Sequence, residues 1–195
     1  MPALTATVSP TVLIVPGLRD HLPEHWQTHL ERRLPEAVSV PRMEADAPEK
    51  LSCAAWVARL DEALARIDGP VILVAHSAGV MIVAHWALRH RRPIEGALLA
   101  TPADLESPLP QGYPTREVLA QNGWLPTPRV PLPFRSIVAA SSNDPLARLE
   151  RVAGLAARWG SSLVHLGAVG HLNPASGFGE WPRAEQFVRE LCASD

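Results

Sequence analysis

One serine stands where a strand is expected to run directly into a helix. Residues Val71 to Val80 read Val-Ile-Leu-Val-Ala-His-Ser-Ala-Gly-Val, with Ser77 at the junction. A sharp turn at that point forces the serine into a strained backbone conformation and lifts its hydroxyl clear of the sheet. Close packing of strand and helix requires small residues two positions before and after the serine, and Ala75 and Gly79 supply them. The segment therefore predicts a nucleophile elbow, in preference to a serine that only caps a helix.

A serine hydroxyl becomes an effective nucleophile only beside a base that a third group orients. His171 follows one predicted strand in Gly-Ala-Val-Gly-His-Leu, and Asp144 follows the preceding strand in Ser-Ser-Asn-Asp-Pro. Because the carboxyl ends of parallel strands meet at one edge of a sheet, both side chains are expected beside Ser77. We expect His171 to act as general base and then as acid, and Asp144 to fix the imidazole tautomer. Asp104, which follows another strand in Thr-Pro-Ala-Asp, is the competing acid.

Two backbone N–H groups are candidates for stabilising the oxyanion of an acyl transfer. The N–H of Ala78 opens the helix after the nucleophile, where unpaired donors and the helix dipole favour negative charge. Gly17 lets the loop after the first strand bend towards the nucleophile, so the N–H of Leu18 is the second candidate. His76 and Trp124 are candidates for lining the substrate pocket, although packing within the fold is the simpler role for His76.

A metal site has weaker support. The string His21-Leu-Pro-Glu24-His25 matches H-x-x-E-H, which marks zinc peptidases when it lies within one helix. Pro23 is expected near the start of that helix, which leaves His21 outside the regular turn that would align two ligands. The two cysteines lie far apart without metal-ligand spacing. We therefore expect neither a metal nor another cofactor.

The elements that must position these residues alternate as in a parallel sheet with helices on both faces. Short runs rich in Val, Ile and Leu lack polar–apolar alternation, which indicates strands buried on both sides. The predicted strands are 11–15, 38–40, 71–75, 96–100, 135–139 and 162–166. Amphipathic stretches between them predict helices at 23–34, 50–67, 78–90, 145–159 and 182–191. We expect an α/β fold with six parallel strands in the order 2-1-3-4-5-6.

The stretch 103–133 interrupts this alternation. It holds seven of the 20 prolines of the chain and only a brief helical interval near residues 115–121. So long a connection inside a compact domain is typical of a functional loop. Six strands and their helices occupy most of the 195 residues, so a large separate cap has no room. We therefore expect one domain over residues 1–195, with 103–133 as a loop or partial lid over the site.

Composition excludes several other classes of protein. The chain carries 18 Lys and Arg against 20 Asp and Glu, a formal net charge of −2, with no basic stripe for nucleic acid. No segment has the length or flanks of a signal peptide or membrane span, so a cytoplasmic protein is expected. The single lysine, Lys50, is typical of a GC-rich bacterial genome. The expected partner is a small-molecule acyl substrate, and nothing in the sequence indicates the oligomeric state.

Six segments spread along the chain match one known pattern. They are 15–17 (Val-Pro-Gly), 25–27 (His-Trp-Gln), 75–79 (Ala-His-Ser-Ala-Gly), 140–145 (Ala-Ser-Ser-Asn-Asp-Pro), 159–160 (Trp-Gly) and 170–182. With them the chain resembles the small serine hydrolases of the retinoblastoma-binding protein 9 and YdeN type, nearly end to end. The resemblance implies a minimal α/β-hydrolase fold in one cofactor-free domain. It places the family triad on Ser77, Asp144 and His171, which favours Asp144 over Asp104.

One property of that family is not expected here. In the vertebrate member, an L-x-C-x-E motif is associated with binding the retinoblastoma protein. Residues 51–55 of this chain read Leu-Ser-Cys-Ala-Ala and lack the glutamate. The motif is therefore incomplete, and that partner is not predicted.

The expected function is hydrolysis of an ester, thioester or activated amide of a small acyl group through an acyl-enzyme, as in a carboxylesterase. Two alternatives remain open. An aminopeptidase-like hydrolase needs an anionic pocket for the substrate amine, for which Asp104 or Glu180 are candidates. A non-catalytic interaction protein that retains a hydrolase fold would typically have lost a triad residue, whereas all three are present here.

Overall fold

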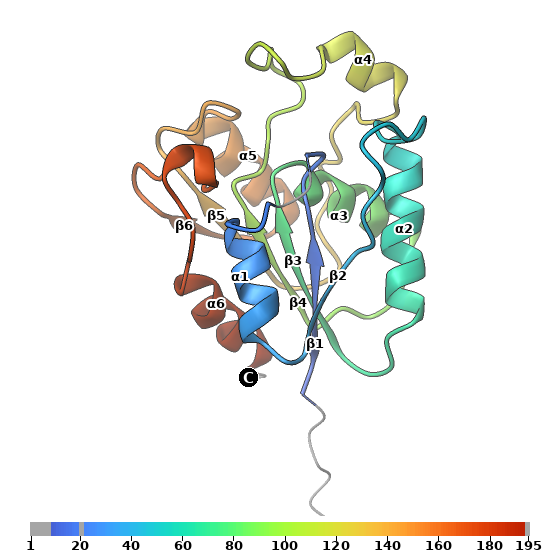
Figure 1. Cartoon of the computed structure of the whole chain (residues 1–195), viewed down its shortest axis with the longest axis vertical. Helices are drawn as coiled ribbons and strands as arrows, with labels where there is room; N and C mark the ends of the chain where they lie inside the picture. The colour runs from blue at the N-terminus through green and yellow to red at the C-terminus, as the bar shows by residue number, and fades with distance from the viewer. Residues whose placement is uncertain (1–8, 20–21, 194–195) are drawn as a thin grey trace, which may run out of the picture.

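A sheet of six parallel strands forms the centre of the computed structural model, which describes residues 9–19 and 22–193 (Figure 1). The strand order is β2-β1-β3-β4-β5-β6, which confirms the sequence prediction. The strands are β1 (Thr11–Val15), β2 (Ala37–Ser39), β3 (Val71–His76), β4 (Gly96–Ala100), β5 (Ser136–Ala140) and β6 (Ser162–His165). All of them run in one direction, so their carboxyl ends meet at one edge.

Helices cover both faces of this sheet. The first face carries α2 (Cys53–Ala65), α3 (Ala78–Arg89) and α5 (Leu149–Trp159), and the second carries α1 (Trp26–Arg33) and α6 (Arg183–Cys192). A short helix, α4 (Arg116–Gln121), lies beyond the carboxyl ends of the strands, at the top of Figure 1. A 3₁₀ turn, Pro174–Ser176, follows β6. No helix in the described part of the chain has the length and apolar character needed to cross a membrane.

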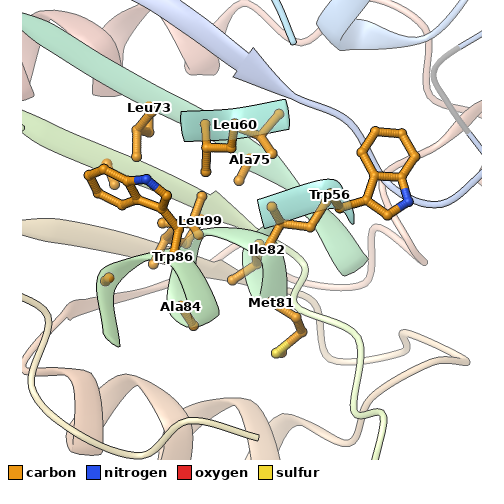
Figure 2. Close-up of a cluster of buried hydrophobic side chains, with 14 of the residues drawn as sticks. Trp56, Leu60, Leu73, Ala75, Met81, Ile82, Ala84, Trp86 and Leu99 are labelled. Atoms are coloured by element: carbon orange, nitrogen blue, oxygen red, sulfur yellow. The ribbon is translucent and has the colours of Figure 1, made fainter. Parts of the chain in front are cut away.

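Alternate residues of the central strands divide between two hydrophobic cores. Leu73 and Ala75 of β3 face the core with α2 and α3, whereas Ile72 and Val74 face the core with α1 and α6. Figure 2 shows the first core, in which the fully buried Trp86 packs between helices and sheet. Complete burial of a large apolar side chain contributes about 1.5–3 kcal/mol. Because both faces are covered, the central strands read as continuous apolar runs rather than alternating ones.

Helix α2 begins at Cys53, three residues later than predicted, and two further helices begin later because their prolines lie in turns instead. Pro23 lies in a turn closed by the His25 N–H on the Leu22 carbonyl, at 2.9 Å, and α1 starts directly after His25. The ring of His25 caps this helix, since its Nδ1 accepts the N–H two residues on, at 3.2 Å. Pro145 lies in the turn that presents Asp144, so α5 starts only at Leu149.

Candidate active site

Ser77 lies between β3 and α3 in a conformation that non-glycine residues rarely adopt. Its φ is 57° and its ψ is −126°. The tight junction depends on Gly79, because a Cβ there would lie 2.6 Å from the carbonyl oxygen of Pro16. The loop after β1 lies directly against the serine, since a Cβ on Gly17 would lie 3.3 Å from the Cβ of Ser77. This is the geometry of a nucleophile elbow at the carboxyl edge of the sheet.

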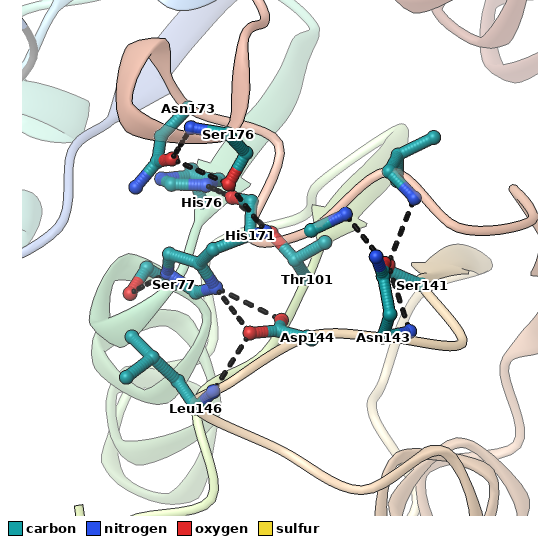
Figure 3. Close-up of polar contacts among 12 residues, drawn as sticks. His76, Ser77, Thr101, Ser141, Asn143, Asp144, Leu146, His171, Asn173 and Ser176 are labelled. Atoms are coloured by element: carbon teal, nitrogen blue, oxygen red, sulfur yellow. Dashed lines mark hydrogen bonds and ion pairs between the residues drawn. The ribbon is translucent and has the colours of Figure 1, made fainter. Parts of the chain in front are cut away.

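A chain of hydrogen bonds joins Ser77 to His171 and Asp144 (Figure 3). The Ser77 hydroxyl lies 2.8 Å from Nε2 of His171, and Nδ1 of that ring lies 2.9 Å from both carboxylate oxygens of Asp144. A carboxylate only accepts, so Nδ1 carries the proton, and the bare Nε2 accepts the serine O–H. The side chains of His171 and Asp144 are 5% and 2% exposed, so water competes little for these bonds.

His76 lines the cavity beside Ser77 and also supports the neighbouring histidine. Its Nε2–H donates to the backbone carbonyl of His171 at 2.9 Å. The His76 ring lies between two others, with centroids 4.7 Å from His25 and 4.8 Å from His171. The sequence offered two roles for His76, pocket lining and packing. In the structure His76 lines the cavity and is also packed within the fold.

Asp104 lies away from the imidazole and binds an arginine instead. Nε and an Nη of Arg151 donate to its carboxylate at 2.9 and 3.1 Å, and the Ser107 hydroxyl donates at 2.6 Å. Burial acts to raise the pKa of Asp104, but the hydrogen bonds from Arg151 and Ser107 outweigh it, and the pKa lies below its usual value. The same arginine binds Glu106, which also pairs with Arg129. The structure thus assigns Asp104 to an ion-pair network.

The two candidate oxyanion donors come from different elements that line the same cavity as Ser77. Leu18 is in the loop after β1, and Ala78 is the first residue of α3. Both residues line the same cavity as the Ser77 side chain. Gly17 approaches Ser77 closely, so this loop lies beside the Ser77 side chain.

A largely apolar cavity of about 490 Å³ opens above Ser77. Its apolar walls come from several loops and from the stretch 103–133. They include Leu18, Leu22, Leu51, Ala103, Leu105, Leu109, Tyr113, Pro114, Leu119, Leu146, Pro174 and Ala175. Arg19 also lines it, stacking 3.9 Å from the ring centroid of Tyr113 and donating to the Gly112 carbonyl at 2.7 Å. No Asp or Glu of the described residues lies among its walls.

Trp124 was expected to face the substrate, and this expectation is wrong. Its side chain is completely buried, and its Nε1–H donates to the Leu51 carbonyl at 2.6 Å. Its ring packs edge-on against His85, and it is not among the cavity walls. Trp124 instead anchors the proline-rich stretch to the core, because an aromatic ring buries more apolar area there than at the rim.

The H-x-x-E-H string can be followed only in part, since His21 falls outside the described residues. His25 caps α1 and lines the cavity. Among residues 9–19 and 22–193, no group of three or more His, Cys, Asp or Glu side chains is arranged to hold a metal ion.

Several polar residues of the site were not singled out from the sequence. Asn143 and Ser141 join the loops that carry Asp144 and His171, and Ser176 binds the backbone N–H of His171 at 3.0 Å. The signals for them in the sequence are their place near Asp144 and His171 and their position within the matching segments 140–145 and 170–182. Each of them accepts a backbone N–H group, and no residue pattern reveals such a contact.

The doubly covered parallel sheet and the serine at its carboxyl edge define an α/β-hydrolase fold. A YdeN-like hydrolase of Pectobacterium atrosepticum has a similar structure, with a TM-score of 0.76 and 31% identity over 95% of this chain and 94% of that one. The ydeN product of B. subtilis gives 0.69 and 20% identity, covering 94% and 98%. Est1E of Butyrivibrio proteoclasticus, with ferulic acid bound, gives 0.70 and 13% identity, covering 98% and 90%. The last two likenesses concern the fold alone.

The family follows from the sequence match. The model of the serine hydrolase family matches residues 12–190, so this chain belongs to that family. Comparison with curated proteins finds no match.

Proposed function

We propose that the protein hydrolyses carboxylic esters or thioesters through an acyl-enzyme on Ser77. The observation that carries this proposal is the hydrogen-bonded chain from Ser77 through His171 to Asp144 at 2.8 and 2.9 Å. The bare Nε2 of His171 accepts the hydrogen bond of the Ser77 hydroxyl and would take its proton during the attack, and Asp144 would stabilise the imidazolium that forms. Family membership supports hydrolysis as the reaction class.

Acylation begins when Oγ of Ser77 attacks the substrate carbonyl carbon and its proton passes to Nε2 of His171. The carbonyl oxygen becomes an oxyanion, for which the N–H groups of Leu18 and Ala78 are the proposed donors. Collapse of this intermediate breaks the bond to the leaving group, which takes the proton from His171. A water molecule then loses a proton to His171 and attacks the acyl carbon. The acid leaves, and the proton returns to Ser77.

The cavity favours an uncharged or apolar acyl group over a substrate amine. Its walls are mostly aliphatic, and its described lining contains no carboxylate that could bind an ammonium group. The two carboxylates considered for that role have other surroundings: Asp104 binds Arg151, and Glu180 lies 3.7 Å from Arg33. An aminopeptidase would leave the substrate cation unpaired here, so we favour the esterase over the peptidase.

Replacement of Ser77 tests the proposal. Ser77→Ala is expected to abolish hydrolysis of a short-chain aryl ester and covalent labelling by a fluorophosphonate, because both reactions need the same Oγ. The circular dichroism spectrum should remain that of the wild-type protein. Labelling of the variant at the wild-type rate would contradict the assignment of the nucleophile.

The two alternatives have separate tests. We expect the wild-type protein to cleave the ester of a neutral acid faster than the amide of an amino acid. A preference for the amino-acyl amide would favour the peptidase. If the wild-type protein neither turns over any ester nor reacts with the fluorophosphonate, it is a non-catalytic member of the family.

A further inference from the structure

The proposed acid and base lie on different loops, and their contact depends on how these loops are held together. Asp144 follows β5 and His171 follows β6, so 27 positions separate them in the chain. Regular pairing of β5 with β6 ends at Ala140 and His165. A backbone bond from Ser142 to Gly167, at 2.9 Å, continues it by one step. Beyond that point, side chains must hold the two loops in register.

Of the side-chain bonds that link the two loops, the one made by Asn143 lies next to Asp144 and His171 in the sequence. Its Oδ1 accepts the backbone N–H of Gly170 at 2.6 Å. Asn143 immediately precedes the acid, and Gly170 immediately precedes the base. One hydrogen bond thus joins the two chain segments one residue away from the Asp144–His171 contact. Because the backbone N–H is a donor, the amide oxygen and not its nitrogen must face Gly170.

Ser141 fixes the side chain of Asn143 in this position. The Ser141 hydroxyl donates to Oδ1 of Asn143 at 3.0 Å and accepts the N–H of Val169 at 3.2 Å. Ser141 is itself buried, with 2% of its surface exposed. The pair therefore binds two consecutive N–H groups of the loop that leads to the base. We call these two side chains, Ser141 and Asn143, the loop clasp.

The backbone N–H and carbonyl of His171 have partners outside the loop that carries Asp144. The N–H of His171 donates to Oγ of Ser176 at 3.0 Å, and its carbonyl accepts from His76 at 2.9 Å. Gly170 has a φ of 58°, and a Cβ there would overlap the Ser176 side chain. These contacts fix His171 against its own loop and against β3. The loop clasp adds the connection to the loop of the acid.

We propose that Asn143 is a positioning residue that sets the separation between Asp144 and His171. This inference rests on the proposed function of these two residues. Asn143 does not line the cavity, so it acts through the loops and not on the substrate. Loss of its amide oxygen frees the Gly170 N–H, and the base can then drift from the acid. A displacement of about 1 Å at a reacting group can cost on the order of 100-fold in rate.

The test compares Asn143→Ala with Asn143→Asp in steady-state hydrolysis of a short-chain aryl ester. The alanine variant should lose about 10- to 100-fold in kcat with an unchanged KM, because the cavity is intact. The aspartate variant keeps an acceptor oxygen for Gly170 and should recover most of kcat. Ser142→Ala is the matched control, since this exposed neighbour uses only its backbone N–H in the link to Gly167. It should retain the wild-type kcat.

The outcomes separate this inference from the proposed function. If Asn143→Ala has the kcat of Ser142→Ala, or if Asn143→Asp is as slow as the alanine variant, Asn143 does not position the base. A lower unfolding temperature with unchanged kcat at 20 °C would show a purely structural role and would likewise overturn the inference. Full activity of Ser77→Ala would instead reject the proposed function itself.

Discussion

The loops that carry Asp144 and His171 are held in a different way from the proline-rich stretch 103–133 that lines the cavity above them. The two loops are joined to each other by hydrogen bonds in which the side chains of Asn143 and Ser141 accept backbone N–H groups. The proline-rich stretch has a few separate anchors. Among them are the buried Trp124 and the ion pairs of Glu106.

This difference matches what each region must do. In the proposed mechanism, proton transfer between Ser77 and His171 tolerates little displacement, and closely spaced bonds hold the loops of Asp144 and His171. The cavity wall has only to exclude water and present apolar surface, which a few strong anchors achieve. Changes in the two loops should therefore reduce kcat, whereas changes in the proline-rich stretch should act mainly on stability and substrate binding.

The largest effect is expected for Asp144→Asn. An amide can donate to Nδ1 of His171, which favours the tautomer whose Nε2 carries the proton and cannot accept that of Ser77. We expect kcat for an aryl ester to fall on the order of 10⁴-fold. The measurement is steady-state hydrolysis beside an unfolding curve. An Asp144→Asn enzyme within tenfold of wild type would show that the acid lies elsewhere.

Trp124→Ala should give the next largest effect, on stability. Removing this fully buried ring opens a cavity and leaves the Leu51 carbonyl without its donor, so the free energy of unfolding should fall by about 3–5 kcal/mol. Urea unfolding measures this directly. Trp124→Phe, which keeps most of the ring volume, should lose less. If the alanine variant is as stable as wild type, Trp124 is not an anchor of the proline-rich stretch.

A smaller loss of stability is expected for Asp104→Asn, which also tests the competing acid. The change weakens two hydrogen bonds from a partly exposed arginine, so we expect a loss of about 1–3 kcal/mol. Its kcat should stay close to wild type, because Arg151 and not His171 binds this carboxylate. A greater loss of kcat than in Asp144→Asn would make Asp104 the acid.

The smallest effect concerns pH and the histidine beneath Trp124. Burial lowers the pKa of His85, although its hydrogen bond to the Trp124 carbonyl, at 3.1 Å, opposes this. As the pH falls through about 6.5, His85 therefore binds a proton in the unfolded chain, whereas in the folded protein it stays neutral until a lower pH. Stability should fall as the pH decreases below that value. His85→Gln removes this titratable group. Its unfolding temperature should therefore decrease less than that of the wild-type protein between pH 7.5 and 5.5.

Titration of Asp104 does not contribute to the change in stability between pH 7.5 and 5.5. The pKa of Asp104 lies below its ordinary value of 3.8. The stability that this carboxylate contributes is therefore complete above pH 3.8 and is lost only at lower pH. The two groups therefore act in separate pH windows. An identical slope for His85→Gln and wild type between pH 7.5 and 5.5 would contradict the assignment to His85.

The sequence predicts the sheet and Ser77 well because both rest on local patterns. Strands buried on both faces are continuous apolar runs, and the elbow needs small residues at fixed positions. Helix starts were less predictable, since Pro145 is compatible both with a first helical turn and with the turn that presents Asp144. Trp124 was misjudged because whether an aromatic in a proline-rich stretch faces the cavity or the core depends on tertiary packing. The contact of Asn143 with Gly170 depends on how two distant loops meet.

The separation of the two edges of the sheet has a practical consequence. Arg135, just before β5, donates to the carbonyl of Ala193 at 2.8 Å, so the chain leaves α6 at the amino edge of the strands. The cavity and Ser77 lie at the opposite edge. A support or carrier protein attached beyond Ala193 would therefore leave the entrance to the cavity facing solution, which makes this end the natural point for immobilising the enzyme.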